Sequence, residues 1–96
     1  MELKQYVMHT DNGHGWLAVK RNELVGLNLL SEISTYSYQR GKTVYLEEDS
    51  DLYKFLLAKY ESEDDFQKAL QKFFSMIRYS HHNSSPIRNY EGFTNV

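Results

Sequence analysis

A helical repeat of apolar residues in the second half of the chain places the strongest constraint on the fold. From residue 66, apolar side chains recur at i, i+3, i+4, i+7 and i+11, which is the spacing of one buried face of an α-helix. The positions are Phe66, Ala69, Leu70, Phe73 and Ile77. The repeat predicts an amphipathic helix that supplies much of the core, since full burial of one large apolar side chain contributes roughly 1.5–3 kcal/mol.

Another helix is predicted just before this one. Asp49, Ser50 and Asp51 are good N-cap residues, and they place negative charge at the positive end of a helix dipole. Apolar residues follow at helical spacing over residues 52–60, and the acidic run 61–65 begins the next helix. The sequence therefore predicts two consecutive helices after residue 50.

The first half begins with the pattern of a β-hairpin. Residues 3–10 alternate loosely between apolar and polar side chains, and residues 16–19 are apolar. Between them, residues 11–15 contain Asn-Gly, a strong turn signal because both residues tolerate positive φ. A short helical segment is predicted next, over residues 20–26, while residues 27–33 favour no element.

A second hairpin is predicted further along. Residues 33–38 and 43–47 are rich in β-branched residues and tyrosine, and they flank a turn that contains Gly41. Because side chains alternate along a strand, Tyr36 and Tyr38 are expected on one face.

The chain has 96 residues and no cysteine, so neither a disulfide framework nor a thiolate cluster can hold it. This length favours one domain with one core. The expected class is α+β: a small antiparallel sheet from two hairpins packed against two C-terminal helices. We expect the domain to cover residues 1–80 and residues 81–96 to form a C-terminal tail, since Pro86 cannot continue a helix.

Residues 1–10 lack the unbroken apolar run of a signal peptide, and no window approaches the roughly 18 apolar residues of a transmembrane helix. We therefore expect a cytoplasmic protein without a membrane partner. The net charge of −2 makes a generally basic nucleic-acid binder less favoured.

Histidines and carboxylates offer candidate chemical groups, but their spacing favours other interpretations. His9, Asp11 and His14 surround a predicted turn, where nothing fixes them as metal ligands. The acidic runs 47–51 and 61–65 suit a divalent cation, yet each lies where a helix begins. The sequence has no Gly-x-Ser-x-Gly elbow, no cysteine nucleophile and no phosphate loop. From the sequence we assign no catalytic residue, no metal and no cofactor.

Aromatic and basic residues crowd the second predicted hairpin, beside an acidic segment. Tyr, Trp and Arg dominate the hot spots of protein interfaces, although tyrosines are also good strand residues. The expected binding residues are Trp16, Tyr36, Tyr38, Arg40, Lys42, Tyr45, Glu47, Glu48 and Asp49.

Two alternative functions stay open. The same aromatics, with Arg78 and Arg88, could stack on single-stranded nucleic acid. A small metal-dependent hydrolase could instead use His9, Asp11 and His14 or the carboxylates.

Three segments occur in a characteristic order: Gly13-His14-Gly15-Trp16-Leu17-Ala18-Val19, Ile33-Ser34-Thr35-Tyr36-Ser37-Tyr38-Gln39-Arg40-Gly41 and Tyr45-Leu46-Glu47-Glu48-Asp49. Over residues 13–55 they resemble a family of small uncharacterised proteins of bacteriophages, conjugative plasmids and other mobile elements. The resemblance implies no reaction, but it implies a small protein in the host cytoplasm that binds a host or defence protein. We therefore expect a non-enzymatic binding protein that inhibits or modulates a host or antiviral defence complex. An exposed strand edge would also make a homodimer reasonable.

Overall fold

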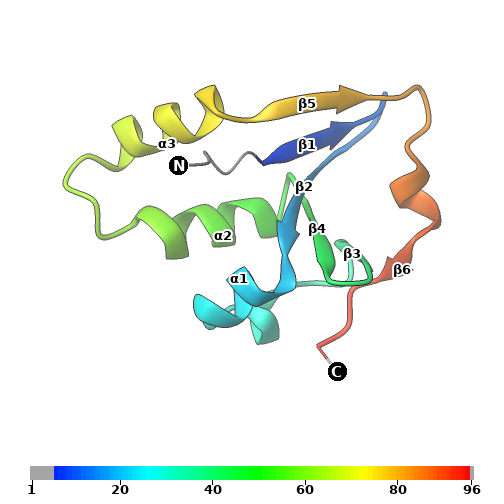
Figure 1. Ribbon diagram of the computed structural model, residues 1–96, viewed down its shortest axis with the longest axis horizontal. Coiled ribbons are helices and arrows are strands. Elements are labelled where there is room, and N and C mark those ends of the chain that lie inside the picture. The colour runs from blue at the N-terminus through cyan, green and yellow to red at the C-terminus, as the bar shows by residue number, and fades with distance from the viewer. Residues whose placement is uncertain (1–5, 96) are drawn as a thin grey trace.

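Six short strands form one sheet in the order β5-β1-β2-β4-β3-β6, in a computed structural model that describes residues 6–95 (Figure 1). Neighbouring strands pair antiparallel except β1 and β5, which are parallel. The strands are β1 (Val7–Thr10), β2 (Gly15–Lys20), β3 (Tyr38–Arg40), β4 (Thr43–Glu47), β5 (Arg78–His81) and β6 (Glu91–Gly92).

Three α-helices and two 3₁₀ turns complete the fold, which is of the expected α+β class. In Figure 1, α2 and α3 lie together on one side of the molecule, away from β6. The two predicted hairpins correspond to β1–β2 and β3–β4, and the two predicted C-terminal helices are α2 and α3. Residues 3–5 of the first predicted strand lie outside the described residues. The bounds are α1 (Arg21–Gly26), η1 (Leu30–Glu32), α2 (Asp51–Tyr60), α3 (Phe66–Ser75) and η2 (Pro86–Asn89).

The core lies between the sheet and the helices α2 and α3. Alternate residues of the strands, among them Leu17 and Leu46, are fully buried on the helix side. Phe55 of α2 and Phe73 of α3 are also fully buried, with ring centroids 6.4 Å apart. The predicted helical repeat therefore does supply core residues, although Phe66 and Leu70 are only half-buried.

The helical repeat predicts a longer helix than the structure has. α3 ends at Ser75, although the apolar spacing continues to Ile77. The backbone N–H of Arg78 instead donates to the carbonyl of Tyr6 at 2.9 Å, and the chain continues as β5 beside β1. This strand was not predicted, because most of its residues are exposed and it lacks an apolar alternation.

The segment expected to be a C-terminal tail instead contributes to the sheet and to the interior. Ile87 is 1% exposed, Phe93 is 3% exposed, and β6 pairs with β3. Because β5 and β6 occupy opposite edges of the sheet, residues 82–90 must pass from one edge to the other. Figure 1 shows this segment on the side opposite α2 and α3. We call residues 82–90 the crossing segment.

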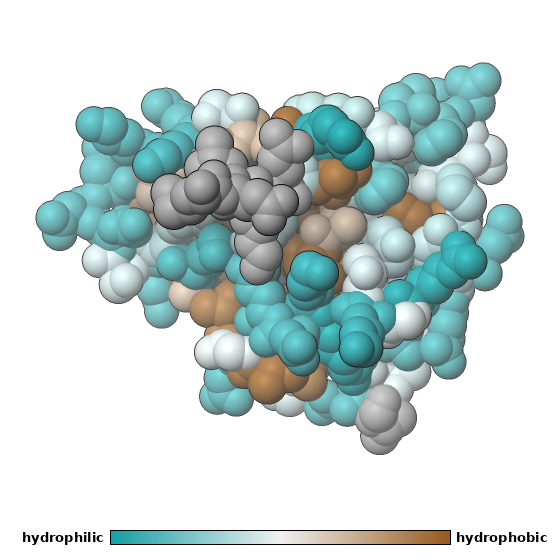
Figure 2. All heavy atoms as spheres, viewed as in Figure 1, coloured by the Kyte–Doolittle hydropathy of each residue, from teal (hydrophilic) through white to brown (hydrophobic). Residues whose placement is uncertain are grey.

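Polar residues cover most of the face in Figure 2, and hydrophobic residues reach the surface in the lower part of the view, where Figure 1 shows α1. Val25 of α1 is 55% exposed. Among residues 6–95, no helix combines the length and the apolar character needed to cross a membrane.

Phe73→Ala should lower the free energy of unfolding by about 3–5 kcal/mol, because it leaves a cavity among buried aromatic rings. Phe74→Ala is the matched control, since the neighbouring ring is 38% exposed and its loss should cost about 1 kcal/mol or less. Urea unfolding of the two variants measures the difference. Equal unfolding midpoints would show that α3 does not hold the core.

Candidate functional site

An open pocket of about 440 Å³ lies where β2 begins and β4 ends, beside the crossing segment. We call it the aromatic pocket. It is lined by His14, Trp16, Thr35, Tyr36, Tyr38, Glu47, Asp49, Ser50 and Arg88.

The sheet places the inner wall of this pocket. Trp16 of β2 pairs with Glu47 of β4, so the two side chains share the sheet face opposite Leu17. Trp16 is 2% exposed, and the Tyr38 ring meets it edge-on with centroids 6.1 Å apart. The His14 ring lies 5.9 Å from the Trp16 ring. The His14 and Tyr38 rings thus both contact the Trp16 ring and form one wall with it.

Asp11 joins the β1–β2 turn to the crossing segment. Its side chain, 2% exposed, accepts hydrogen bonds from Nε of Arg88 at 2.5 Å and from Nη2 of Arg88 at 3.0 Å. The same carboxylate accepts the backbone N–H groups of Gly13 and His14, both at 2.9 Å. The Arg88 guanidinium thereby lies 5.3 Å from the centroid of the Trp16 ring, a cation–π contact.

These bonds also set the ionisation of Asp11. The hydrogen bond from Arg88 is the main cause that holds the pKa of Asp11 well below its usual range, and backbone N–H groups assist while burial opposes. Asp11 is therefore a charged structural group whose oxygens are already bonded.

Asp51 fixes the opposite rim of the pocket. Its side chain is fully buried and accepts the backbone N–H of Ser34 at 2.9 Å, together with the hydroxyls of Ser34 and Ser37 at 2.8 and 2.5 Å. Burial alone would raise the pKa of Asp51, but the hydrogen bonds from Ser37, Ser34 and Lys54 outweigh it and lower the pKa.

This network corrects the predicted strand over residues 33–38. Ser34 to Ser37 form a turn, in which the N–H of Ser37 donates to the carbonyl of Ser34 at 3.3 Å, and β3 begins only at Tyr38. Tyr36 therefore does not share a strand face with Tyr38. It stands at the rim of the aromatic pocket, 72% exposed.

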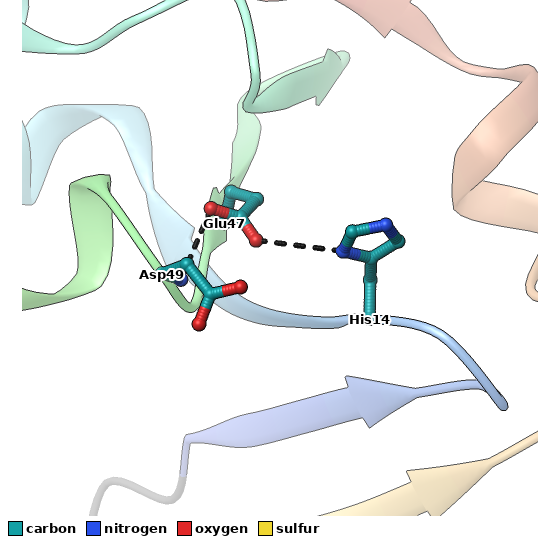
Figure 3. Close-up of side chains that lie close together, drawn as sticks. All are labelled: His14, Glu47 and Asp49. Atoms are coloured by element: carbon teal, nitrogen blue, oxygen red, sulfur yellow. Dashed lines mark hydrogen bonds and ion pairs between the residues drawn. The ribbon is translucent and has the colours of Figure 1, made fainter.

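The remaining rim is acidic (Figure 3). Glu47 is 8% exposed, and its Oε1 accepts from the backbone N–H of Asp49 and the hydroxyl of Ser50, both at 3.0 Å. Its Oε2 lies 3.7 Å from Nδ1 of His14. Ser50, predicted as a helix cap, occupies the N-cap position of α2 but makes no side-chain cap bond there.

Five of the nine expected binding residues meet at the aromatic pocket. The strand register and the turn after β4 bring them together, although Trp16 is distant in sequence from the other four. They are Trp16, Tyr36, Tyr38, Glu47 and Asp49.

The other four expected binding residues lie outside the lining. Tyr45 packs on Tyr90 of the crossing segment, with ring centroids 5.2 Å apart. Arg40 lies 5.0 Å above the same Tyr90 ring and donates to its hydroxyl at 3.1 Å. Lys42 is exposed in the β3–β4 turn.

Glu48 is the fourth of these residues, and its carboxylate lies against Gly15. A Cβ atom at Gly15 would come within 2.8 Å of Oε2 of Glu48, so a side chain there would displace this carboxylate. Burial, followed by the charges of Asp49 and Glu47, raises the pKa of Glu48. The turn after β4 therefore crowds three carboxylates together.

The histidine grouping considered from the sequence does not form. Asp11 forms an ion pair with Arg88, and the His9 ring packs on the Tyr45 ring with centroids 5.7 Å apart. His14 lies with Glu47 and Asp49, and among residues 6–95 this is where three potential metal-ligand side chains converge. Arg88 was expected only as a contact to nucleic acid, but it forms one wall of the pocket. Its partner Asp11 is 77 positions away, so no local sequence pattern could reveal this ion pair.

Comparisons with family models, curated proteins and solved structures found no match to this chain. The case for a function therefore rests on the aromatic pocket itself.

Asp11→Asn should flatten the acid side of the stability profile. A carboxylate with a depressed folded pKa contributes stability above its unfolded pKa of about 3.9, and this contribution is lost as the pH falls through the acid range. The wild-type free energy of unfolding should therefore drop more steeply below about pH 5 than that of the variant. Urea unfolding at several pH values measures both slopes. Asp64→Asn, at an exposed position, controls for the change in net charge, and parallel wild-type and Asp11→Asn profiles would contradict the role given to the Asp11–Arg88 pair.

Proposed function

We propose that this chain is a non-enzymatic binding protein that contacts a partner protein through the aromatic pocket. The observation that carries the proposal is Tyr36, which stands 72% exposed at the rim of a pocket walled by Trp16 and Tyr38. Aromatic side chains beside a well-formed concavity are typical of interface hot spots, where one side chain of a partner enters a pocket.

The pocket is also built to bind at low entropic cost. Trp16 is held between Arg88 and Tyr38, and Arg88 is fixed by Asp11. Side chains that are already immobilised lose little conformational freedom when a partner arrives, so more of the contact energy remains as affinity.

The resemblance to proteins of phages and other mobile elements suggests the kind of partner. On that basis the partner is a host or antiviral defence protein in the host cytoplasm, which the protein inhibits or modulates. The pocket rim carries Glu47 and Asp49, and clustered negative charge favours encounter with a basic surface. The proposal therefore includes a basic patch on the partner.

The stacking of single-stranded nucleic acid, the alternative function, has less support. This alternative expects Arg78 and Arg88 to contact phosphate. The Arg88 guanidinium is bonded through two nitrogens to Asp11, and Arg78 lies on β5, outside the lining of the aromatic pocket. Arg40 lies over Tyr90.

Site-specific photocrosslinking tests the proposed contact. A benzophenone side chain at position 36, in protein made in bacterial host cells, should give a covalent adduct with one host protein. The same probe at Tyr79 is the matched control, because this tyrosine is 62% exposed on β5 and faces the other side of the sheet, beside Met8. Equal adducts from both positions, or none from position 36, would contradict the proposal.

The purified adduct partner then allows an affinity measurement. Tyr36→Ala should weaken binding roughly 30-fold, since truncation of a hot-spot side chain costs about 2 kcal/mol or more. Tyr79→Ala should leave the affinity unchanged. Because both side chains are exposed, neither variant should alter the unfolding midpoint, which urea unfolding checks.

A further inference from the structure

Three side chains with metal-ligand atoms converge at the acidic rim of the aromatic pocket (Figure 3). His14 comes from the β1–β2 turn, Glu47 is the last residue of β4, and Asp49 belongs to the turn before α2. One ligand atom from each lies within 4.8 Å of the other two. We propose that His14, Glu47 and Asp49 form a binding site for a divalent transition-metal ion such as Zn²⁺.

The donor set favours this class of ion. One imidazole nitrogen with two carboxylate oxygens suits Zn²⁺, Mn²⁺ or Co²⁺, whereas Mg²⁺ and Ca²⁺ prefer oxygen ligands throughout. Two ligand atoms of a tetrahedral zinc site lie roughly 3.3 Å apart, given bonds of about 2.0–2.1 Å. Nδ1 of His14 and Oε2 of Glu47 are 3.7 Å apart, so a few tenths of an ångström of movement brings them to that spacing.

The key carboxylate is already oriented for this role. Oε1 of Glu47 accepts two hydrogen bonds, from the N–H of Asp49 and the hydroxyl of Ser50. These bonds aim Oε2 of Glu47 toward His14, as Figure 3 shows. Outer hydrogen bonds of this kind orient ligands and strengthen metal binding.

The aromatic pocket gives the site access. All three side chains line this opening of about 440 Å³, so an ion can enter and its remaining coordination positions face the pocket. Three protein ligands with open positions are the arrangement of metal sites that also take up a further ligand, in contrast to closed four-ligand structural sites.

The local charge also favours a cation. Glu47, Glu48 and Asp49 are consecutive carboxylates at the end of β4 and in the turn after it, so negative charge is concentrated there. The arginine of the pocket lining, Arg88, forms its ion pair with Asp11. An ion of charge +2 between these carboxylates would relieve the repulsion.

Titration of the isolated, untagged protein with Zn²⁺ in a calorimeter tests the proposal. The expected result is saturable binding of one ion per chain near neutral pH. Asp49→Asn and His14→Ala should each weaken binding about tenfold or more, as expected when a group that holds the metal is lost. Both side chains are exposed, so these variants should still fold, which circular dichroism checks. Glu47→Gln is a weaker test because Glu47 is buried.

Two variants serve as controls. Glu63→Gln removes an exposed carboxylate that lies outside both the three-ligand group and the aromatic pocket, and His81→Ala removes an exposed histidine that is bonded to Thr10. Both should bind Zn²⁺ within about twofold of wild type. The proposal is overturned if no saturable binding occurs, if Asp49→Asn binds as tightly as wild type, or if His81→Ala causes the loss. Because no partner protein is present, this result does not depend on the proposed protein contact.

Co²⁺ provides a second readout. Bound at the proposed site, it should give visible absorption bands of a low-symmetry site with nitrogen and oxygen ligands, and Zn²⁺ should displace it. Bands that persist unchanged in both Asp49→Asn and His14→Ala would place the ion elsewhere and overturn the assignment.

Discussion

The Asp11–Arg88 ion pair is the contact on which the rest of the aromatic pocket depends. Asp11 closes the β1–β2 turn through the N–H groups of Gly13 and His14, and it holds the crossing segment through Arg88 and the N–H of Ser85. One carboxylate thereby sets the positions of His14 on one wall and of Arg88 on another. Because its oxygens already accept these bonds, Asp11 acts as a structural group and leaves ligand contacts to its neighbours.

A second buried carboxylate does the same for the opposite rim. Asp51 binds the hydroxyls of Ser34 and Ser37, and Ser37 in turn accepts the N–H of Glu47 at 3.0 Å. The turn that carries Tyr36 is thus connected to the strand that carries Glu47 by a buried, satisfied network. Such a network favours one geometry, since breaking any of its bonds would leave a buried polar group unpaired. The exposed residues of the pocket stand on this rigid base.

Local patterns were sufficient to predict the elements but not the way they meet. The Asn-Gly turn and the apolar repeat around Phe73 depend on neighbours within a few residues. The hairpin turn and the presence of the helix were therefore predicted, although α3 ends at Ser75, earlier than the repeat indicates. Propensity failed at Tyr36, where β-favouring residues form a turn because a distant carboxylate, Asp51, binds the serines on either side. β5 was missed because an exposed edge strand needs no apolar alternation.

The lining of the aromatic pocket was likewise predicted only in part. The expected aromatic and acidic residues did include five that line the pocket. Four of them, from Tyr36 to Asp49, lie within or directly beside the β3–β4 hairpin, whereas Trp16 comes from β2. The parts that were missed, Arg88 as a wall and His14 beside Glu47, require contacts between segments more than 30 positions apart. A single sequence carries no signal for such pairs, because the contacts depend on the packed fold.

The crossing segment also determines when the pocket exists. Its residue Arg88 is the last residue of the pocket lining to be synthesised. The rest of the lining, residues 14–50, is made earlier. A nascent chain that ends before residue 85 has already received both hairpins and both long helices, but it has neither the Arg88 wall nor the partner that closes the Asp11 turn. The aromatic pocket therefore lacks one of its walls, and the Asp11 turn lacks its Arg88 partner, until residue 88 has been made.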